Sequence, residues 1–246
     1  MAAPLKLIQL NIERGLHLAD TLPFLEREGP DIACFQEVFE QQVPELTAAV
    51  GGTAVFEPMS IYEGHVHGVA IIIKHKIVDH RAYQLGEYGE SLPAYDESTF
   101  ESKYRTSRFV LLVAEIDTPN GRYKVATTHF PVTEKGAATD YQRTSMERLL
   151  KVLAVQGEFV LTGDFNAPRG GEIFSQLATA YTDNVPPQYK TSIDAKRHRA
   201  GKIRPHELID KMVDGVFSTP GYAVTNVRLV DDVSDHCAIV AEVLAQ

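Results

Sequence analysis

The sequence predicts an α/β sandwich in which two β-sheets pack face to face and helices cover their outer sides. Apolar runs of strand length outnumber the segments with helical periodicity, which favours a fold built mainly on sheets. These runs do not alternate regularly with helices, which points to two packed sheets. No linker rich in Pro, Gly or Ser and no repeat divides the 246 residues, so we expect one domain over residues 1–246.

The strands are predicted from short apolar runs bounded by polar residues or turn formers. In chain order they lie near residues 6–10, 31–36, 53–57, 68–73, 109–116, 123–128, 158–162, 213–217 and 238–244. Residues 86–108 are polar and contain turn formers, so we expect a long loop there.

Helices are predicted where apolar residues recur at helical spacing. The clearest pattern covers residues 140–155, and a second covers 16–28, where Gly29-Pro30 ends the helix. Shorter helices are expected at 41–50 and 172–180.

The composition is that of a soluble globular protein, with 44% hydrophobic and 23% charged residues. No apolar stretch approaches the roughly 20 residues that span a bilayer. The first predicted strand begins directly after the amino terminus, which leaves no room for a signal peptide. Cys34 and Cys237 lie in apolar runs and are expected to be buried free thiols, consistent with a cytoplasmic protein.

A net charge of −9 argues against a protein that coats polyanions. It does not argue against an enzyme that acts on phosphates, because a divalent ion bound by carboxylates supplies local positive charge.

Polar residues capable of metal binding or proton transfer stand at the ends of several predicted strands. In chain order they are Asn11, Glu37, His129, Asp164, Asn166, Asp235 and His236. Asp164 and Asn166 are two positions apart and would share one face of a strand. We therefore expect a single site at one edge of the sheet core.

Each of these residues has a structural alternative. Glu37 follows a buried run, where an acid is costly unless it is paired or bound to metal, and we favour a metal ligand over a salt bridge. Asn11 is a metal-site candidate or a turn former. His129 is an acid or phosphate-binding candidate, or a structural histidine.

Asp235 and His236 stand at a loop-to-strand junction, where they could play different roles in one cleft. Asp235 is a candidate metal ligand, and His236 a candidate for phosphate contact or proton transfer. A carboxylate commonly orients such a histidine. Asp214 is preferred for that role because its neighbours are apolar, and Asp210 is its rival.

Basic residues gather between Lys190 and Lys211, including Arg197 and Arg199. This segment is either a phosphate-facing loop or a solvated surface loop.

Tyr104, Arg105 and Arg108, near the end of the 86–108 loop, are further candidate substrate contacts, with ordinary surface as the alternative. His65 and His67 could together bind a transition metal, but no third ligand is evident, so a substrate-facing loop or plain turn is preferred.

The ordered motifs resemble those of the endonuclease/exonuclease/phosphatase (DNase I-like) superfamily. They are Leu10-Asn11-Ile12, Phe35-Gln36-Glu37-Val38, Thr128-His129-Phe130, Gly163-Asp164-Phe165-Asn166, Val213-Asp214-Gly215-Val216-Phe217-Ser218 and Ser234-Asp235-His236. The resemblance implies a four-layered α/β sandwich of two mainly antiparallel sheets. It also implies a Mg²⁺ site, for which Mn²⁺ is a possible substitute, and a phosphoester substrate.

The resemblance also implies a role for each site residue. Glu37 would be the principal metal ligand, with Asn11 and Asp235 near the metal. Asp164 and Asn166 would orient the attacking water and the phosphate. His236, held by Asp214, and His129 would contact the phosphoryl group or move protons.

Some positions depart from particular subgroups. Gly215 stands where an aromatic residue is common, and the chain has no Trp, unlike the signature of inositol 5-phosphatases. An abasic-site endonuclease would usually carry asparagine at the position of His129.

The leading hypothesis is a Mg²⁺-dependent phosphodiesterase that cleaves nucleic acid, DNA or RNA, as a monomer. The alternative is the same chemistry on a lipid or small-molecule phosphoester. The minor alternative is an inactive binding module, which the full set of site residues disfavours.

Overall fold

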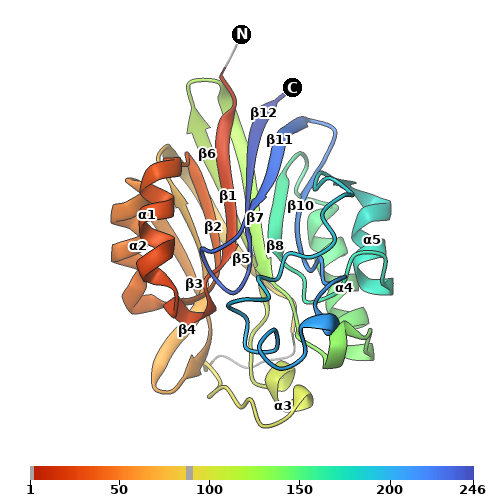
Figure 1. Ribbon diagram of the computed structural model, residues 1–246. Helices are drawn as coiled ribbons and strands as arrows, with labels where there is room; N and C mark the ends of the chain where they lie inside the picture. The colour runs from red at the N-terminus through yellow and green to blue at the C-terminus, as the bar shows by residue number, and fades with distance from the viewer. Residues whose placement is uncertain (1–2, 87–90) are drawn as a thin grey trace.

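The computed structural model describes residues 3–86 and 91–246, which form two six-stranded β-sheets packed against each other (Figure 1). The first sheet has the strand order β11-β12-β1-β2-β4-β3, and the second has the order β5-β6-β7-β8-β10-β9. In the first sheet the strands are β1 (Leu5–Asn11), β2 (Ile32–Phe39), β3 (Thr53–Tyr62), β4 (His65–Ile73), β11 (Tyr222–Val230) and β12 (Ala238–Ala245). In the second they are β5 (Lys76–Gln84), β6 (Val110–Thr118), β7 (Gly121–His129), β8 (Val160–Asp164), β9 (Thr182–Asp183) and β10 (Asp214–Ser218).

Both sheets are mixed but mainly antiparallel. Each contains one parallel pair, β1 with β2 and β7 with β8, and its other pairings are antiparallel. The predicted fold class, with two sheets at its centre, is confirmed.

Helices cover the outer face of each sheet and complete four layers (Figure 1). Helices α1 (Leu18–Glu28) and α2 (Val43–Val50) pack on the first sheet, where Phe24 and Leu46 join the apolar cluster of Ile8 and Leu10. Helices α4 (Asp140–Leu153) and α5 (Glu172–Ala180) cover the second. None of the helices in the described ranges is long and apolar enough to cross a membrane.

The expected loop at 86–108 is not wholly irregular. Residues 100–105 form the short helix α3 (Phe100–Arg105), which Thr99 caps by accepting a hydrogen bond from the backbone N–H of Ser102. A Thr cap supplies local hydrogen bonds that a search for apolar periodicity does not detect. Residues 87–90 of the expected loop lie outside the described residues.

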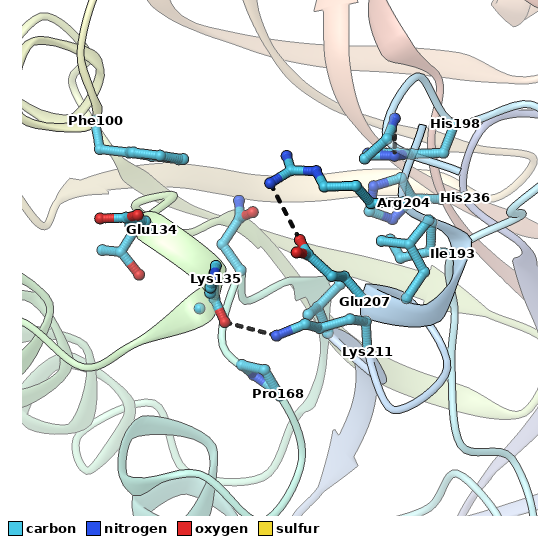
Figure 2. A pocket seen from close by; sticks show the side chains of 16 residues that line it. Phe100, Glu134, Lys135, Pro168, Ile193, His198, Arg204, Glu207, Lys211 and His236 are labelled. Atoms are coloured by element: carbon cyan, nitrogen blue, oxygen red, sulfur yellow. Dashed lines mark hydrogen bonds and ion pairs between the residues drawn. The ribbon is translucent and has the colours of Figure 1, made fainter. Parts of the chain in front are cut away.

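The segment between Lys190 and Lys211 folds over the end of the sheets and forms one wall of a cavity of about 480 Å³ (Figure 2). Ile193, His198 and Leu208 of this segment line the cavity, while Phe100 and Lys135 lie across from it. We call this space the lateral cavity.

The contact between the two sheets becomes polar near this end. The side chain of Gln9 on β1 donates hydrogen bonds of 2.8 Å to Gln36 on β2 and to Asp214 on β10 of the other sheet. Gln36 in turn donates to Thr127 on β7, also at 2.8 Å. A buried amide that lost its partner would cost about 1–3 kcal/mol, so this network fixes the relative position of the sheets where polar residues converge.

Candidate active site

Asp164, the last residue of β8, has a site residue beside it on each neighbouring strand. It lies opposite Asp214 in the antiparallel pair with β10, and opposite His129 in the parallel pair with β7. Adjacent strands lie about 4.8 Å apart, so strand pairing alone gathers these three residues. Burial and the nearby charge of Asp214 raise the pKa of Asp164.

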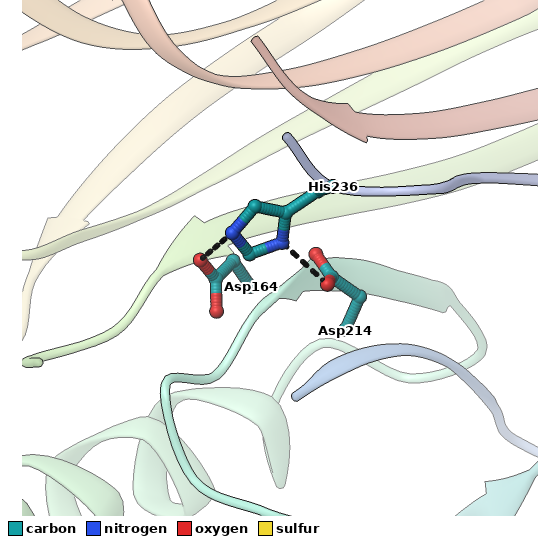
Figure 3. A group of neighbouring side chains, drawn as sticks. All are labelled: Asp164, Asp214 and His236. Carbon is teal, nitrogen blue, oxygen red and sulfur yellow. Dashed lines mark hydrogen bonds and ion pairs between the residues drawn. The ribbon is translucent and has the colours of Figure 1, made fainter. Parts of the chain in front are cut away.

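His236 comes from the side of the other sheet, where it lies two residues before β12 (Figure 3). Its Nδ1 lies 2.7 Å from Oδ2 of Asp214, and its Nε2 lies 3.8 Å from Oδ2 of Asp164. Burial opposes a charged imidazole, but Asp214 and Asp164 outweigh it and raise the pKa of His236 well above its usual range. Asp210, the rival for this role in the sequence, is exposed.

Glu37 lies in a β-bulge of β2. The pairing of β2 with β4 shifts register between Phe35 and Val38, and Glu37 has a left-handed φ of +54°. A non-glycine residue seldom adopts this conformation, which is concentrated at functional sites, and bulges commonly re-aim a side chain. Here the bulge places the Glu37 carboxylate 3.2 Å from the amide nitrogen of Asn11 and 2.6 Å from Arg14.

Two contacts fix the electrostatics of Glu37. Burial opposes its charge, but the Arg14 guanidinium and the nearby His129 overcome this and lower the pKa of Glu37 to about 2. Asn11 ties Glu37 to the rest of the site, because the same amide nitrogen donates to Oδ2 of Asp164 at 3.1 Å.

Asn166 also has a left-handed backbone, with φ of +49°. Its backbone N–H donates to Oδ1 of Asp164 at 2.8 Å. Its side-chain nitrogen lies 2.9 Å from the carbonyl oxygen of Phe130 and 3.1 Å from Nε2 of His129. Both protons of the Asn166 side-chain amide are thus engaged by other residues of the protein.

Asp235 is buried in the same cleft, where the Ser234 hydroxyl donates to it at 3.3 Å. Burial, reinforced by the negative charges of Glu13 and Glu37 and opposed by His236, raises the pKa of Asp235 to about 7. His198, from the segment over the sheet ends, approaches Asp235 with its Nε2 at 3.9 Å. Burial first, and then His236, lowers the pKa of His198 to about 4.

Sequence reasoning missed His198. It stands among basic residues with no apolar run beside it, so no strand-end pattern could have marked it.

A sequence profile of the Endonuclease/Exonuclease/phosphatase family matches residues 8–236. The chain belongs to this family. Its members hydrolyse phosphoric esters, so the protein is a phosphoric ester hydrolase. No functionally curated protein matches the chain in sequence.

Solved structures of low sequence identity share the fold. An endonuclease/exonuclease/phosphatase from Beutenbergia cavernae is 19% identical with a TM-score of 0.74, and the match covers 99% of this chain and 72% of that one. A mannosyl-6-phosphatase from Bacteroides thetaiotaomicron is 14% identical with a TM-score of 0.68, covering 98% and 99%. The human Nocturnin catalytic domain is 18% identical with a TM-score of 0.67, covering 100% and 96%.

Family members generally depend on a divalent metal, and the residues present fit a hard cation. Glu37, Asp164 and Asp235 line one cleft, and Asn11 connects the first two. Carboxylate and amide oxygens are the ligands that Mg²⁺ and Mn²⁺ accept. Burial disfavours the charged carboxylates of Asp164 and Asp235 and so raises the pKa of both. A bound cation would stabilise these charged forms.

A second acidic group overlaps this one. Ligand atoms of Asp164, Asp214 and His236 all lie within 4.8 Å of one another (Figure 3). However, a 2.7 Å hydrogen bond already joins Asp214 to His236. This trio is therefore better suited to positioning a proton than to enclosing an ion.

The five proposed substrate contacts do not all reach the cleft. Arg199 lines it, with Lys103 nearby. Arg197 instead turns toward α1, where it pairs with Asp20 at 2.7 Å.

Tyr104 and Arg105 line a separate hollow on the surface. There Tyr104 stacks on Tyr141 with ring centroids 4.6 Å apart, and Arg105 pairs with Glu101 at 2.7 Å. Arg108 is half-buried and lines neither the cleft nor this hollow.

Proposed function

We propose that this protein is a Mg²⁺-dependent phosphoester hydrolase in which His236 and Asp164 act directly on the reacting groups. The observation that carries the proposal is the buried Asp214–His236 pair, which faces Asp164 beside a cleft lined by Glu37 and Asp235. When bound, the divalent cation would neutralise charge on the phosphoryl oxygens.

The chain's own residues would orient the other reacting groups. Asp214 accepts from Nδ1–H of His236 and, with Asp164, raises the pKa of the ring, so His236 carries a second proton and its Nε2–H would donate a hydrogen bond to a phosphoryl oxygen. Oδ2 of Asp164 lies 3.7 Å from His129 and 3.8 Å from His236, where it would accept a proton from the attacking water. Asn11 would hold Asp164 and Glu37 at a fixed separation.

A small organic phosphoester is the substrate that the geometry supports best. The lateral cavity adjoins the catalytic cleft and shares Asn166, His198 and His236 with it. Its lining combines apolar side chains with charged ones, as expected for a bounded organic group.

The basic segment offers little free positive charge to a polymer. Five of its seven cations have partners within the protein: Arg197 with Asp20, Lys196 with Asp232, Arg204 with Glu207, and Lys190 and Lys211 with the carbonyl oxygens of Pro187 and Lys135. Non-specific binding of nucleic acid depends on such cations being available to phosphates.

Nucleic acid is the second candidate substrate. Arg199 and Lys103 border the cleft. A structural neighbour is the endonuclease domain of a telomere-specific retrotransposon, with a TM-score of 0.61 at 16% identity. Cleavage of DNA or RNA whose affinity falls steeply with salt would favour this candidate.

The test is a substrate panel assayed with Mg²⁺, with Mn²⁺ and with EDTA. It contains plasmid DNA, single-stranded RNA, phosphocholine-lipid vesicles, a hexose 6-phosphate and bis-p-nitrophenyl phosphate. His236→Ala should abolish metal-dependent turnover, whereas His80→Ala, which changes an exposed histidine on β5, should leave it unchanged. No metal-dependent turnover of any member would count against the proposal.

A further inference from the structure

Two buried histidine nitrogens beside the active site have no hydrogen-bond partner within residues 3–86 and 91–246. They are Nε2 of His67, on β4, and Nδ1 of His129, at the end of β7. Both histidines line one small cavity together with Glu37, Tyr95 and Ser107. A buried polar group left unpaired costs about 1–3 kcal/mol, so two of them at one cavity call for a partner.

The hydrogen bonds of Asn166 assign the tautomer of His129. The Asn166 atom that lies 2.9 Å from the carbonyl oxygen of Phe130 must be the nitrogen, because two oxygens would repel. The same nitrogen lies 3.1 Å from Nε2 of His129, so this ring nitrogen accepts. In neutral His129 the proton is then on Nδ1, the buried nitrogen that lacks a partner within the described residues.

His67 presents the complementary atom. Its Nδ1 lies 3.3 Å from the hydroxyl of Ser60, which can accept a hydrogen bond from Nδ1–H and so leaves Nε2 as an acceptor. Burial is the main cause that lowers the pKa of His67 to about 4, so the ring is neutral near neutral pH. The rings of Phe39 and Tyr95 pack around it, with centroids 6.2 Å and 6.4 Å away.

The size of the cavity defines the ligand. It measures about 20 Å³. A single water needs on the order of 10–15 Å³ and at least two polar partners. One water fits this space, whereas an organic group does not.

We propose that one ordered water accepts a hydrogen bond from Nδ1–H of His129 and donates one to Nε2 of His67, and so holds His129 with Nε2 facing the catalytic cleft. His67 is thus a positioning residue that acts through His129. Its effect on turnover rests on the proposed function, but the water and the tautomer do not.

Two measurements on the metal-free wild-type protein test the water and the tautomer. A high-resolution crystal structure should show a water between the two rings. Long-range ¹⁵N–¹H NMR spectra of the histidine rings should show the Nδ1–H tautomer for His129. Absence of the water, or a dominant Nε2–H tautomer in the wild type, would overturn the proposal whether or not the protein hydrolyses phosphoesters.

Variants then test the positioning role. His67→Leu removes the acceptor and should give a mixture of tautomers at His129, with a roughly 10- to 100-fold loss of kcat. His67→Gln keeps an acceptor and should restore most of both. His65→Leu, two residues earlier on β4 and exposed, is the matched control and should change neither.

Thermal unfolding identifies any variant that fails to fold. If His67→Leu does not fold, the His129 tautomer in the spectrum of His67→Gln provides the test. An unchanged His129 tautomer in folded His67→Leu would contradict the positioning role. Loss of the Nδ1–H tautomer in folded His67→Gln would contradict it as well. A wild type that shows the water and the tautomer but hydrolyses no phosphoester would overturn only the proposed function.

Discussion

Asp214 is held at both carboxylate oxygens by residues of the opposite sheet. Its Oδ2 lies 2.7 Å from Nδ1 of His236, and its Oδ1 accepts a 2.8 Å hydrogen bond from Gln9. Asp214 begins β10 of the second sheet, whereas Gln9 and His236 belong to or adjoin strands of the first. Relative movement of the sheets would therefore misplace the His236 ring.

Asp214→Asn should lower kcat on the order of 10²- to 10⁴-fold, because the amide can hold His236 in the wrong tautomer and cannot stabilise its charged form. The measurement is steady-state hydrolysis of the best substrate of the panel. Asp210→Asn is the matched control, since it makes the same change at an exposed acid four residues earlier. Equal losses in both variants would contradict the assignment of Asp214.

His67 should make the metal-free protein less stable in acid. Its pKa is lowered to about 4 in the folded state, mainly by burial, against an ordinary value of 6.5. Between these values the unfolded chain takes up a proton that folded His67 does not, so the free energy of unfolding falls as the pH is lowered. The slope approaches about 1.4 kcal/mol per pH unit, and the total loss approaches roughly 3 kcal/mol.

Urea unfolding followed across this pH range in EDTA measures this loss. His67→Gln should flatten the curve between the two pKa values, while His65→Gln should not. A His67→Gln curve that falls in parallel with the wild type would show that other groups cause the acid instability.

Glu37→Gln should weaken Mg²⁺ binding by at least about 10-fold, because the variant loses a carboxylate whose pKa is lowered to about 2 and leaves Arg14 without its 2.6 Å partner. Titration calorimetry with Mg²⁺, repeated with Mn²⁺, measures the affinity directly and does not depend on turnover. Glu45→Gln, at an exposed acid on α2, provides the control. Unchanged affinity in Glu37→Gln would place the ion elsewhere.

Most strands could be predicted because their apolar runs are buried, as in Val160–Asp164, where every residue is buried. Strands β5 and β11 were missed for the opposite reason. β5 is an edge strand whose side chains are largely exposed, and β11 is an edge strand that is mostly half-buried and has polar residues in its middle, so neither carries the continuous apolar run that marks a buried strand.

The candidate site was predictable where a polar residue ends a buried strand, as Asp164 does, since strand pairing then determines its neighbours. Contacts made by side chains of irregular segments could not be predicted. The turn of Arg197 toward Asp20 and the entry of His198 into the cleft depend on how residues 190–211 fold over the sheets, and charge pattern alone does not encode that path.

Phe100→Ala tests whether the lateral cavity binds a substituent of the substrate. Phe100 is 41% exposed and faces the cavity across from His236, so its removal should cost little stability (Figure 2). An aromatic contact is worth about 0.5–1.5 kcal/mol, which corresponds to a loss of roughly 2- to 10-fold in kcat/KM for bis-p-nitrophenyl phosphate. Methyl p-nitrophenyl phosphate, which has one small ester group, should be affected much less.

Val155→Ala, at an exposed apolar residue that does not line the cavity, should affect neither substrate. Equal losses on both substrates in Phe100→Ala would instead assign this residue to the cleft as a whole and remove the cavity as a determinant of specificity.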